Sequence, residues 1–397
     1  MSLAEPVETA LPTTTVAERA AAPATLPPVT AGALTWRGAR RDDAGALHAL
    51  QDQVSAADGE PFRVSLDEVE ETLAAGYRDL DADFLLGFDD DGVLRAFAQA
   101  DVRPGDRTAA RAFVWGGVHP GRRGEGIGRE LMAWGIARAR QKLATSHLAG
   151  ERVPAWIAVH SEDDAPASRV RLYEHAGFAV RRYYSCLGRD LAQPIPEPVI
   201  PGQEAGAASS AHAGAAAPSS SGSSLRLVAW TPELDEPARL ARNDAFRDHW
   251  GSQPQSQVTW AEDRDQFMAP WTWLVVDDAP DVDALLASPD TDEETAAALR
   301  AGQPLVVAYN WAARYEQDFA VRGFTFGYSE NVGARRAYRG RGLARAALAA
   351  GLRAMAGDGM QYALLDVDTA NPTGALGLYA GLGYEKLDGS RMWSIEV

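Results

Sequence analysis

The chain has 397 residues, of which 46% are hydrophobic and 23% are charged, a composition typical of a soluble globular protein with two domains. The formal net charge of −17 disfavours nucleic acid and anionic membranes as partners, because both repel an acidic surface. Cys186 is the only cysteine, which excludes an intramolecular disulfide and a cysteine-built zinc site. With neither a membrane-length apolar run nor a secretory signal in the sequence, we expect a cytoplasmic protein.

Two segments lack the apolar periodicity of folded elements. Residues 1–32 consist mostly of Ala, Pro, Thr and Glu, and they predict a disordered tail. Residues 193–224 begin Pro-rich and end Gly/Ser-rich, which predicts a disordered interdomain linker. The remaining blocks are 33–192, the expected N-terminal domain, and 225–397, the expected C-terminal domain.

Hydrophobic patterning predicts the same order of elements in both blocks. The first block is expected to contain a strand at 34–37, helices at 42–57 and 66–77, strands at 84–88, 93–102 and 108–118, a Gly-rich turn, a long helix to about 144, and a strand at 153–159. The second is expected to contain a strand at 225–230, helices at 236–250 and 259–269, strands at 273–276, 305–311 and 324–334, a Gly-rich turn, a long helix to about 356, and a strand at 362–368. Each block then ends with a short helix and closing strands.

Residues 278–303 form an acidic insertion in the second block. Eight acids and no base lie between Asp277 and Glu294. Such a run is usually a solvated loop, and a lid over a cationic acceptor is the alternative. Nearby aromatic residues are expected to pack amphipathic helices, although an aromatic pocket wall is possible; they are Trp250, Trp260, Trp271 and Trp273, next to the helix-end residue His249.

Two motifs recur in order in both blocks, which indicates a duplication. The first is Arg123-Gly-Glu-Gly-Ile-Gly128 in one block and Arg339-Gly-Arg-Gly-Leu-Ala344 in the other. Its small residues allow backbone N–H groups to point into one concavity, and the first turn of the following helix adds more donors. This arrangement suits a diphosphate. The alternative is a sharp bend with no ligand, which two copies in matching contexts disfavour.

Two other phosphate-binding motifs are excluded. A P-loop requires a Gly-Lys pair, and the chain contains none. A dinucleotide fingerprint requires Gly-x-Gly-x-x-Gly and an acid ending the next strand, whereas here the spacing is shorter and the helix still continues at that distance.

The second motif is Leu-Tyr-x3-Gly-aromatic, with its tyrosine at 173 and at 379. Together the two motifs resemble the signatures of the GNAT N-acetyltransferase superfamily. The resemblance implies an α/β (α+β) mixed-sheet protein made of two tandem GNAT acyl-CoA N-acyltransferase folds. Each sheet would splay between its fourth and fifth strands, with acetyl-CoA in the splay. Within the superfamily, the tandem arrangement and the segments 242–250 and 371–379 resemble mycothiol synthases and related actinobacterial acetyltransferases.

The same resemblance implies two sets of acetyl-CoA-binding residues. In the second block they are Val332, Gly333, Ala334, Arg339, Gly340, Arg341, Gly342, Leu343, Ala344 and Asn371. In the first block they are Val118, Arg123, Gly124, Glu125, Gly126, Ile127 and Gly128. No metal is implied.

Acetyl transfer to an amine requires a base and a proton donor. The resemblance gives Tyr379 the role of protonating the leaving thiolate, and core packing is its alternative. Glu330 is the candidate base on the strand that enters the diphosphate loop, and strict alternation would place it on the face of residues 328, 332 and 334. A solvent-facing or Arg-paired glutamate is the other interpretation, with Asp366 and Asp368 as reserve bases.

The first block departs from this pattern. Val114 and Ala165 stand where the second block has Glu330 and Asn371, and only Tyr173 is kept. We therefore expect the C-terminal domain to be catalytic and the N-terminal domain to be degenerate or regulatory. The predicted reaction is acetyl transfer from acetyl-CoA to a primary amine of a small molecule or a protein N-terminus, by a monomer or homodimer. The alternative is a non-catalytic acyl-CoA sensor or scaffold.

Overall fold

The computed structural model describes residues 11–200, 224–261, 264–370 and 374–397. The chain divides into two compact units. Unit 1 comprises the residues up to Tyr183 together with Ser390–Val397, and unit 2 comprises Tyr184–Gly389. The units therefore do not coincide with the sequence blocks 33–192 and 225–397, because each unit includes a strand from the other block.

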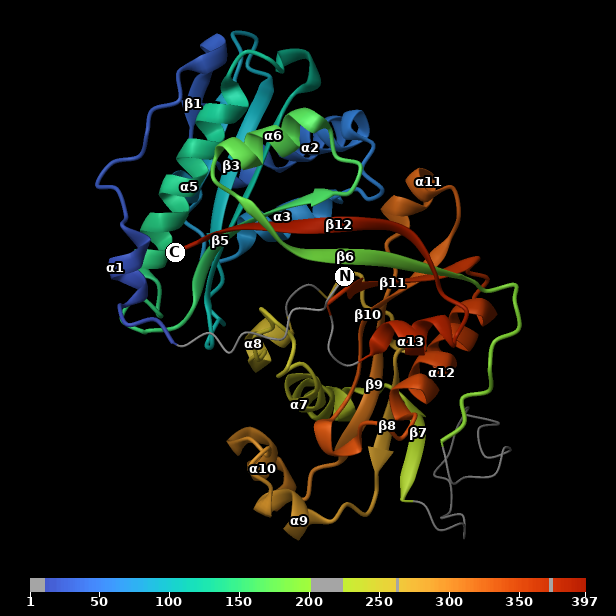
Figure 1. Cartoon of the computed structure of the whole chain (residues 1–397). Helices are drawn as coiled ribbons and strands as arrows, with labels where there is room; N and C mark the ends of the chain where they lie inside the picture. Colours follow the sequence, from blue (N-terminus) through green and yellow to red (C-terminus); the bar gives the residue numbers. More distant parts are fainter. Residues whose placement is uncertain (1–10, 201–223, 262–263, 371–373) are drawn as a thin grey trace, which may run out of the picture. The chain divides into compact units, whose positions relative to one another are not determined.

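Unit 1 is a mixed sheet with helices on both faces (Figure 1). Its strand order is β1 (Thr35–Arg37), β2 (Phe84–Phe88), β3 (Leu94–Val102), β4 (Ala110–Val118), β5 (Ala155–Glu162) and β12 (Glu385–Glu396). Its main helices are α2 (Ala44–Asp58), α3 (Leu66–Ala74), α4 (Leu80–Asp83), α5 (Ile127–Thr145) and α6 (Ala167–His175). Successive residues of β3 point to opposite faces, because Phe97 packs with α2 whereas Ala96 and Ala98 pack with α5.

Unit 2 repeats this plan. Its strand order is β7 (Leu225–Ala229), β8 (Trp273–Asp277), β9 (Leu305–Ala313), β10 (Phe326–Ala334), β11 (Tyr362–Asp368) and β6 (Ala179–Asp190). Its helices are α7 (Asp235–Ala245), α8 (Gln257–Trp260), α9 (Val282–Ala287), α10 (Glu293–Arg300), α11 (Phe319–Arg322), α12 (Leu343–Gly357) and α13 (Ala375–Ala380). Tyr309 of β9 packs with α7, and the next residue, Asn310, faces Gly351 of α12. The sheet thus lies between α7 and α12.

The last strand of each sheet comes from the other block of the sequence. In unit 1, Ser390–Glu396 of β12 pair antiparallel with Trp156–Glu162 of β5. In unit 2, Tyr184–Asp190 of β6 pair antiparallel with Tyr362–Asp368 of β11. Both added strands belong to a core: Trp393 is 4% exposed and donates a hydrogen bond from Nε1 to Ser161 Oγ at 3.0 Å, and Leu187 joins the largest cluster of unit 2.

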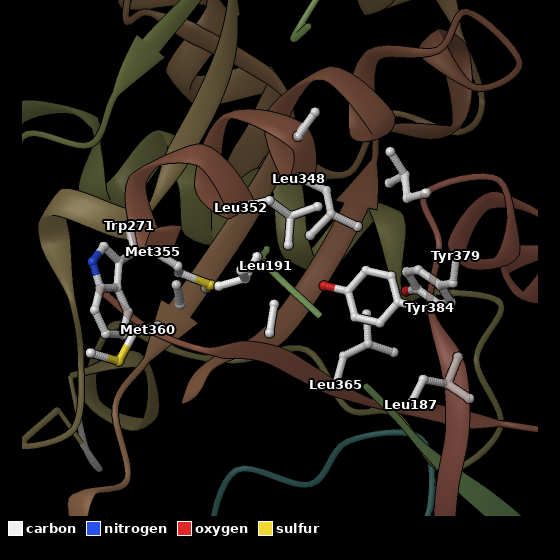
Figure 2. Close-up of a cluster of buried hydrophobic side chains, with 14 of the residues drawn as sticks. Leu187, Leu191, Trp271, Leu348, Leu352, Met355, Met360, Leu365, Tyr379 and Tyr384 are labelled. Carbon is white, nitrogen blue, oxygen red and sulfur yellow. The ribbon is translucent and has the colours of Figure 1, made fainter. Parts of the chain in front are cut away.

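The fourth and fifth strands separate in both units. In unit 2 the parallel pairing of β10 with β11 ends at Tyr328 and Leu364, although both strands continue. In unit 1 the pairing of β4 with β5 ends at Phe113 and Ala158. The α12 side of the unit 2 sheet carries a core of leucines, methionines and tyrosines that includes Leu348, Leu365 and Tyr379 (Figure 2). The splayed mixed α/β sheet expected from the sequence is confirmed in each unit.

The N-terminal segment differs from the expected disordered tail. Residues 16–20 form α1 (Val16–Ala20), which begins with a capping box between Thr15 and Glu18. Val16 and Ala20 are fully buried in a core cluster of unit 1. The expectation was wrong for this segment because buried Val16 and Ala20, together with backbone hydrogen bonds from Val16 to Glu151 and from Ala17 to Ala149, hold the short helix against unit 1. Residues 1–10, and residues 201–223 of the expected linker, lie outside the described residues.

The acidic insertion is also more ordered than a solvated loop. It contains α9 and α10, and its acids bind arginines of unit 2. Asp290 accepts from Arg336 at 3.0 Å, and Glu294 accepts from Arg239 at 2.8 Å. The insertion therefore gives neighbouring arginines their counterions, which the local charge run could not reveal.

Two expected features have different outcomes. The helix expected at 259–269 is reduced to α8, and Phe267 instead forms an isolated bridge with Ala313. Packing of the tryptophans is confirmed for Trp260 and Trp271, which are both buried in cores. Among the described residues, no helix is both long enough and apolar enough to span a membrane.

Candidate active site

The Gly-rich turns form the same structure in both units. Gly340 and Gly342 have φ of +73° and +71°, and Gly124 and Gly126 both have φ of +86°, a region that favours glycine. Gly342 and Gly126 are the N-caps of α12 and α5, and no side chain caps either helix. The first-turn N–H groups therefore face outward from a bend that only small residues can make.

The space outside these turns suits a phosphate group. A Cβ added at Gly340 or Gly124 would meet no atom within 4 Å, so the space beside the backbone is open at both turns. The helix N-terminus adds partial positive charge at the same place. The residues present therefore fit a diphosphate.

Acidic side chains already neutralise several arginines near the unit 2 loop. Arg339 donates from Nη1 to Asp248 Oδ2 at 2.8 Å and from Nη2 to the Ala245 carbonyl at 2.8 Å. Arg336 binds both Asp248 and Asp290. Arg341 is exposed, and its guanidinium lies 5.2 Å from the centre of the Tyr338 ring. Arg341 is thus the loop cation that is best exposed to an incoming phosphate.

The unit 1 loop has a different charge pattern. Glu125 occupies the position of Arg341 and accepts from Arg122 at 2.9 Å. Arg123 is paired with Asp58 at 2.6 Å. Asp58 also accepts from Arg169, which brings α2 and α6 together. The two loops therefore have the same backbone conformation, but the side chain between their two glycines is positive in unit 2 and negative in unit 1.

A cavity of about 410 Å³ opens beside the unit 1 loop. Its lining brings together six of the seven residues expected to bind acetyl-CoA in this unit: Val118, Arg123, Gly124, Gly126, Ile127 and Gly128. Tyr173 and Val114 also line it. Glu125, the seventh, pairs with Arg122.

In unit 2 the expected binding residues divide between the loop and the strand that precedes it. Val332 packs against the α12-side core, and Ala334 and Leu343 join a second cluster on that helix. Gly333 faces the other side, since a Cβ there would lie 2.7 Å from the Tyr309 hydroxyl. Asn371 lies outside the described residues.

Glu330 occupies a β-bulge. The pairing of β10 with β9 shifts between Ser329 and Asn331, which leaves Glu330 as the extra residue. Strict alternation across the strand was therefore wrong: Tyr328 and Glu330 lie near one another, whereas Val332 and Ala334 pack on the α12 side. A bulge re-aims a side chain, and here it presents the carboxylate to solvent.

Unit 1 has no counterpart of this residue. When the strands are matched at the last parallel pair, Tyr328 corresponds to Phe113, and both chains then continue to Ala334 and Val118. The segment from Tyr328 to Ala334 is one residue longer than the segment from Phe113 to Val118. In unit 1 the pairing of β4 with β3 has no register shift and therefore no bulge. Val114 thus corresponds to Ser329, and Glu330 is an insertion.

The two units also differ where their fourth and fifth strands begin to separate. In unit 2, Tyr328 donates to Asp366 Oδ2 at 2.8 Å. In unit 1 the same two positions are Phe113 and His160, which stack with their rings 6.3 Å apart. Burial lowers the pKa of His160 to about 4, so it is neutral at pH 7. Unit 1 has an aromatic stack where unit 2 has a tyrosine hydrogen-bonded to a carboxylate.

Loss of water around the carboxylate raises the pKa of Asp366, although the hydrogen bond from Tyr328 opposes this. Cys186 is its antiparallel partner on β6, and burial raises the pKa of that thiol. Cys186 is thus a buried and protonated neighbour of Asp366, which agrees with the sequence interpretation of a buried small residue.

The motif tyrosines differ in their hydrogen bonds. Tyr173 donates from its hydroxyl to the His160 carbonyl at 3.1 Å. Tyr379 is 8% exposed and lies edge-on to Tyr384, with their ring centres 5.9 Å apart (Figure 2). Among the described residues, no hydrogen-bond partner of the Tyr379 hydroxyl is found. Burial raises the pKa of Tyr379 to about 12, so the hydroxyl keeps its proton at pH 7.

Sequence reasoning missed one polar residue of this face. Tyr315, just after β9, donates a hydrogen bond from its hydroxyl to Glu330 Oε1. No motif marks it, and only the shifted register brings it to the glutamate. Within the described ranges, no group of three or more His, Cys, Asp or Glu side chains is arranged to hold a metal ion.

Comparisons with known proteins agree with the duplicated fold. The model of the acetyltransferase (GNAT) family matches twice, at residues 50–178 and 244–384. A mycothiol acetyltransferase of Thermobispora bispora is 29% identical over 317 residues, which are 80% of this chain and 82% of the relative. A mycothiol acetyltransferase of Streptomyces bingchenggensis is 27% identical over 318 residues, or 79% of this chain and 81% of the relative.

Solved structures share the same architecture. A GCN5-related N-acetyltransferase from Sphaerobacter thermophilus superposes with a TM-score of 0.59 at 22% identity, covering 94% of this chain and 97% of that one. A tandem GNAT protein from the clavulanic acid biosynthesis pathway superposes with a TM-score of 0.54 at 15% identity, covering 91% and 98%. At these identities the likeness shows the fold. With two family matches that together cover more than half of its length, the chain belongs to the acetyltransferase (GNAT) family and is a tandem-domain acetyltransferase.

Proposed function

We propose that unit 2 transfers an acetyl group from acetyl-CoA to the primary amine of a small molecule. The observation that carries this proposal is the bulge of β10, which adds Glu330 at the open end of the splay in unit 2 alone. Relatives named mycothiol acetyltransferases favour a small-molecule amine of the mycothiol type over a protein N-terminus. The proposal includes a cytoplasmic location, where a thioester donor is available.

In the proposed reaction, Glu330 removes a proton from the acceptor ammonium, so that the nitrogen lone pair can attack the thioester carbonyl carbon. Backbone N–H groups of β10 beyond the splay would polarise the carbonyl oxygen. The C–N bond forms, the C–S bond breaks, and the Tyr379 hydroxyl gives its proton to the departing sulfur. The second proton of the attacking nitrogen then passes to the Tyr379 oxygen, and the proton on Glu330 is released to solvent. The Tyr379 hydroxyl carries its proton at neutral pH, as the donor role requires.

The donor site of this proposal is the loop that begins α12. Exposed Arg341 and the uncapped helix N-terminus would bind the diphosphate, while Val332 and Ala334 would lie along the strand that leads to it. Unit 1 would be a weakened or regulatory copy, because its loop carries Glu125 and its splay lacks the base.

Replacing Gly342 with glutamate is expected to lower kcat/KM for acetyl-CoA roughly 100-fold or more, since a carboxylate would enter the space for the diphosphate. Gly342→Ala is the matched control, because it carries the same positive-φ strain without the charge. Steady-state kinetics of both variants of the full chain would measure the difference. Equal kcat/KM values for the two variants would show that this loop does not bind the diphosphate of acetyl-CoA.

The reaction itself is tested by thiol release from acetyl-CoA across a panel of amines, which includes amino sugars, aminoglycosides, polyamines and peptide N-termini. We expect release with at least one small-molecule amine and loss of that release in Glu330→Gln. If the full chain binds CoA in calorimetry but releases no thiol with any amine, the sensor alternative takes its place.

A further inference from the structure

Glu330 lies at an exposed bulge, as the extra residue between Ser329 and Asn331. A glutamate in such a place samples several rotamers, and ordering it costs conformational entropy. The hydroxyl of half-buried Tyr315 donates to Oε1 of this carboxylate. Such a bond selects one rotamer and stabilises the ionised form over the protonated form.

Tyr315 is itself held by packing. Its ring lies edge-on to the ring of Tyr328, with centres 5.6 Å apart and planes at 89°. Tyr328 donates its own hydroxyl to Asp366, not to Glu330. The two tyrosines therefore form one aromatic pair that serves two separate carboxylates.

Unit 1 has no counterpart of either Glu330 or Tyr315. Ala313 of β9 lies opposite Tyr328, and Asp101 of β3 lies opposite Phe113, so position 315 corresponds to position 103, an arginine. Glu330 and Tyr315 are thus both present in unit 2 and both absent from unit 1. This pattern is expected if the two residues act together.

We propose that Tyr315 is a positioning residue that holds the Glu330 carboxylate ionised and aimed at the acceptor nitrogen. This inference rests on the proposed function, in which Glu330 is the base. Two sets of titratable groups surround the aromatic pair. Around Tyr328 lie Asp366 on β11, Cys186 on β6 and the ion pair of Arg322 with Asp388, and beside Tyr315 in the sequence Arg314 pairs with Glu316. Of the two tyrosines, only Tyr315 bonds to Glu330 in the described contacts.

The experiment compares Tyr315→Phe with Tyr328→Phe in the full chain, with one acceptor throughout so that the amine's own ionisation is constant. Both changes remove one hydroxyl and keep the ring. Without its donor, the Glu330 carboxylate binds a proton more readily, so the acidic limb of the kcat/KM profile should move to higher pH by about 0.5–1 unit in Tyr315→Phe. The limb should not move in Tyr328→Phe.

A double variant separates positioning from general support of the fold. Because Tyr315 acts through Glu330, Tyr315→Phe in a Glu330→Gln background should lower kcat by less than about twofold, whereas alone it should lower kcat roughly tenfold. A tenfold loss in both backgrounds would show a merely structural role and overturn the proposal. The same comparison holds if Tyr315→Phe reduces stability, since that loss would appear in both backgrounds.

Two further outcomes are distinct. A shifted limb in Tyr328→Phe with an unshifted limb in Tyr315→Phe would make Asp366 the functional carboxylate and overturn the role of Tyr315. If Glu330→Gln keeps the full rate, the proposed base itself fails, whatever the tyrosine variants do.

Discussion

Glu330→Gln should lower kcat by about 10²–10⁴-fold, the range that a positioned general base contributes. The amide keeps the size of the side chain but cannot accept the ammonium proton. Binding of acetyl-CoA should change by less than about twofold, because Glu330 lies in the middle of β10 and the binding loop begins only after Ala334. Steady-state kinetics with a saturating acceptor and calorimetric titration with CoA would measure the two effects.

The matched control is Glu316→Gln. Glu316 lies next to Tyr315 in the sequence, its side chain is 69% exposed, and it pairs with Arg314 at 3.0 Å. This change removes one negative charge from the same neighbourhood and should leave kcat within about a factor of two, because exposed ion pairs contribute little. Equal losses in the two variants would attribute the effect to local charge instead of proton transfer.

Tyr379→Phe should lower the overall rate at least tenfold with little change in CoA affinity, a loss of about 1.4 kcal/mol in the transition state alone. The ring stays in the core, so the change removes only the proton donor. Tyr173→Phe should leave the rate within about a factor of three, because the Tyr173 hydroxyl is already bound to the His160 carbonyl and unit 1 lacks the base.

Kinetics of both phenylalanine variants on any working acceptor distinguish the units, and thermal unfolding of each variant reports whether the fold is intact. A larger loss in Tyr173→Phe than in Tyr379→Phe would place the reaction in unit 1. Comparable losses in both would indicate two active copies.

Much of the structure of the proposed donor loop could be predicted from local sequence. The Gly-x-Gly turns need positive φ, and a strand before them and an apolar helix after them leave little choice of structure. The splay was implied by the family resemblance that these motifs carry, and the difference between the copies was expected from Val114 and Ala165 in the first block. Glu330 was singled out from its residue type and place on the strand, and its role remains a proposal.

The bulge could not be predicted from one strand, because an extra residue leaves the apolar pattern of nine residues nearly unchanged. The bulge becomes visible when Phe113 and Tyr328 are matched as the last residues of β4 and β10 in parallel pairing. That match requires the pairing register of β4 with β5 and of β10 with β11, which only the structure gives. The contact of Tyr315 with Glu330 depends on this shift. The counterions of the acidic insertion were hidden for a similar reason, since Arg239 and Arg336 are far away in sequence.

The exchanged strands have a consequence for how the protein is made. The β5 edge of unit 1 has no partner until residues 390–397 have been synthesised and have left the ribosome, although most of unit 1 emerges first. During that interval Trp156 and its neighbours belong to an open sheet edge, the kind of surface that attracts other nascent chains. A frameshift or premature stop just before residue 390 would therefore damage unit 1, although nearly all of that unit lies upstream of the change.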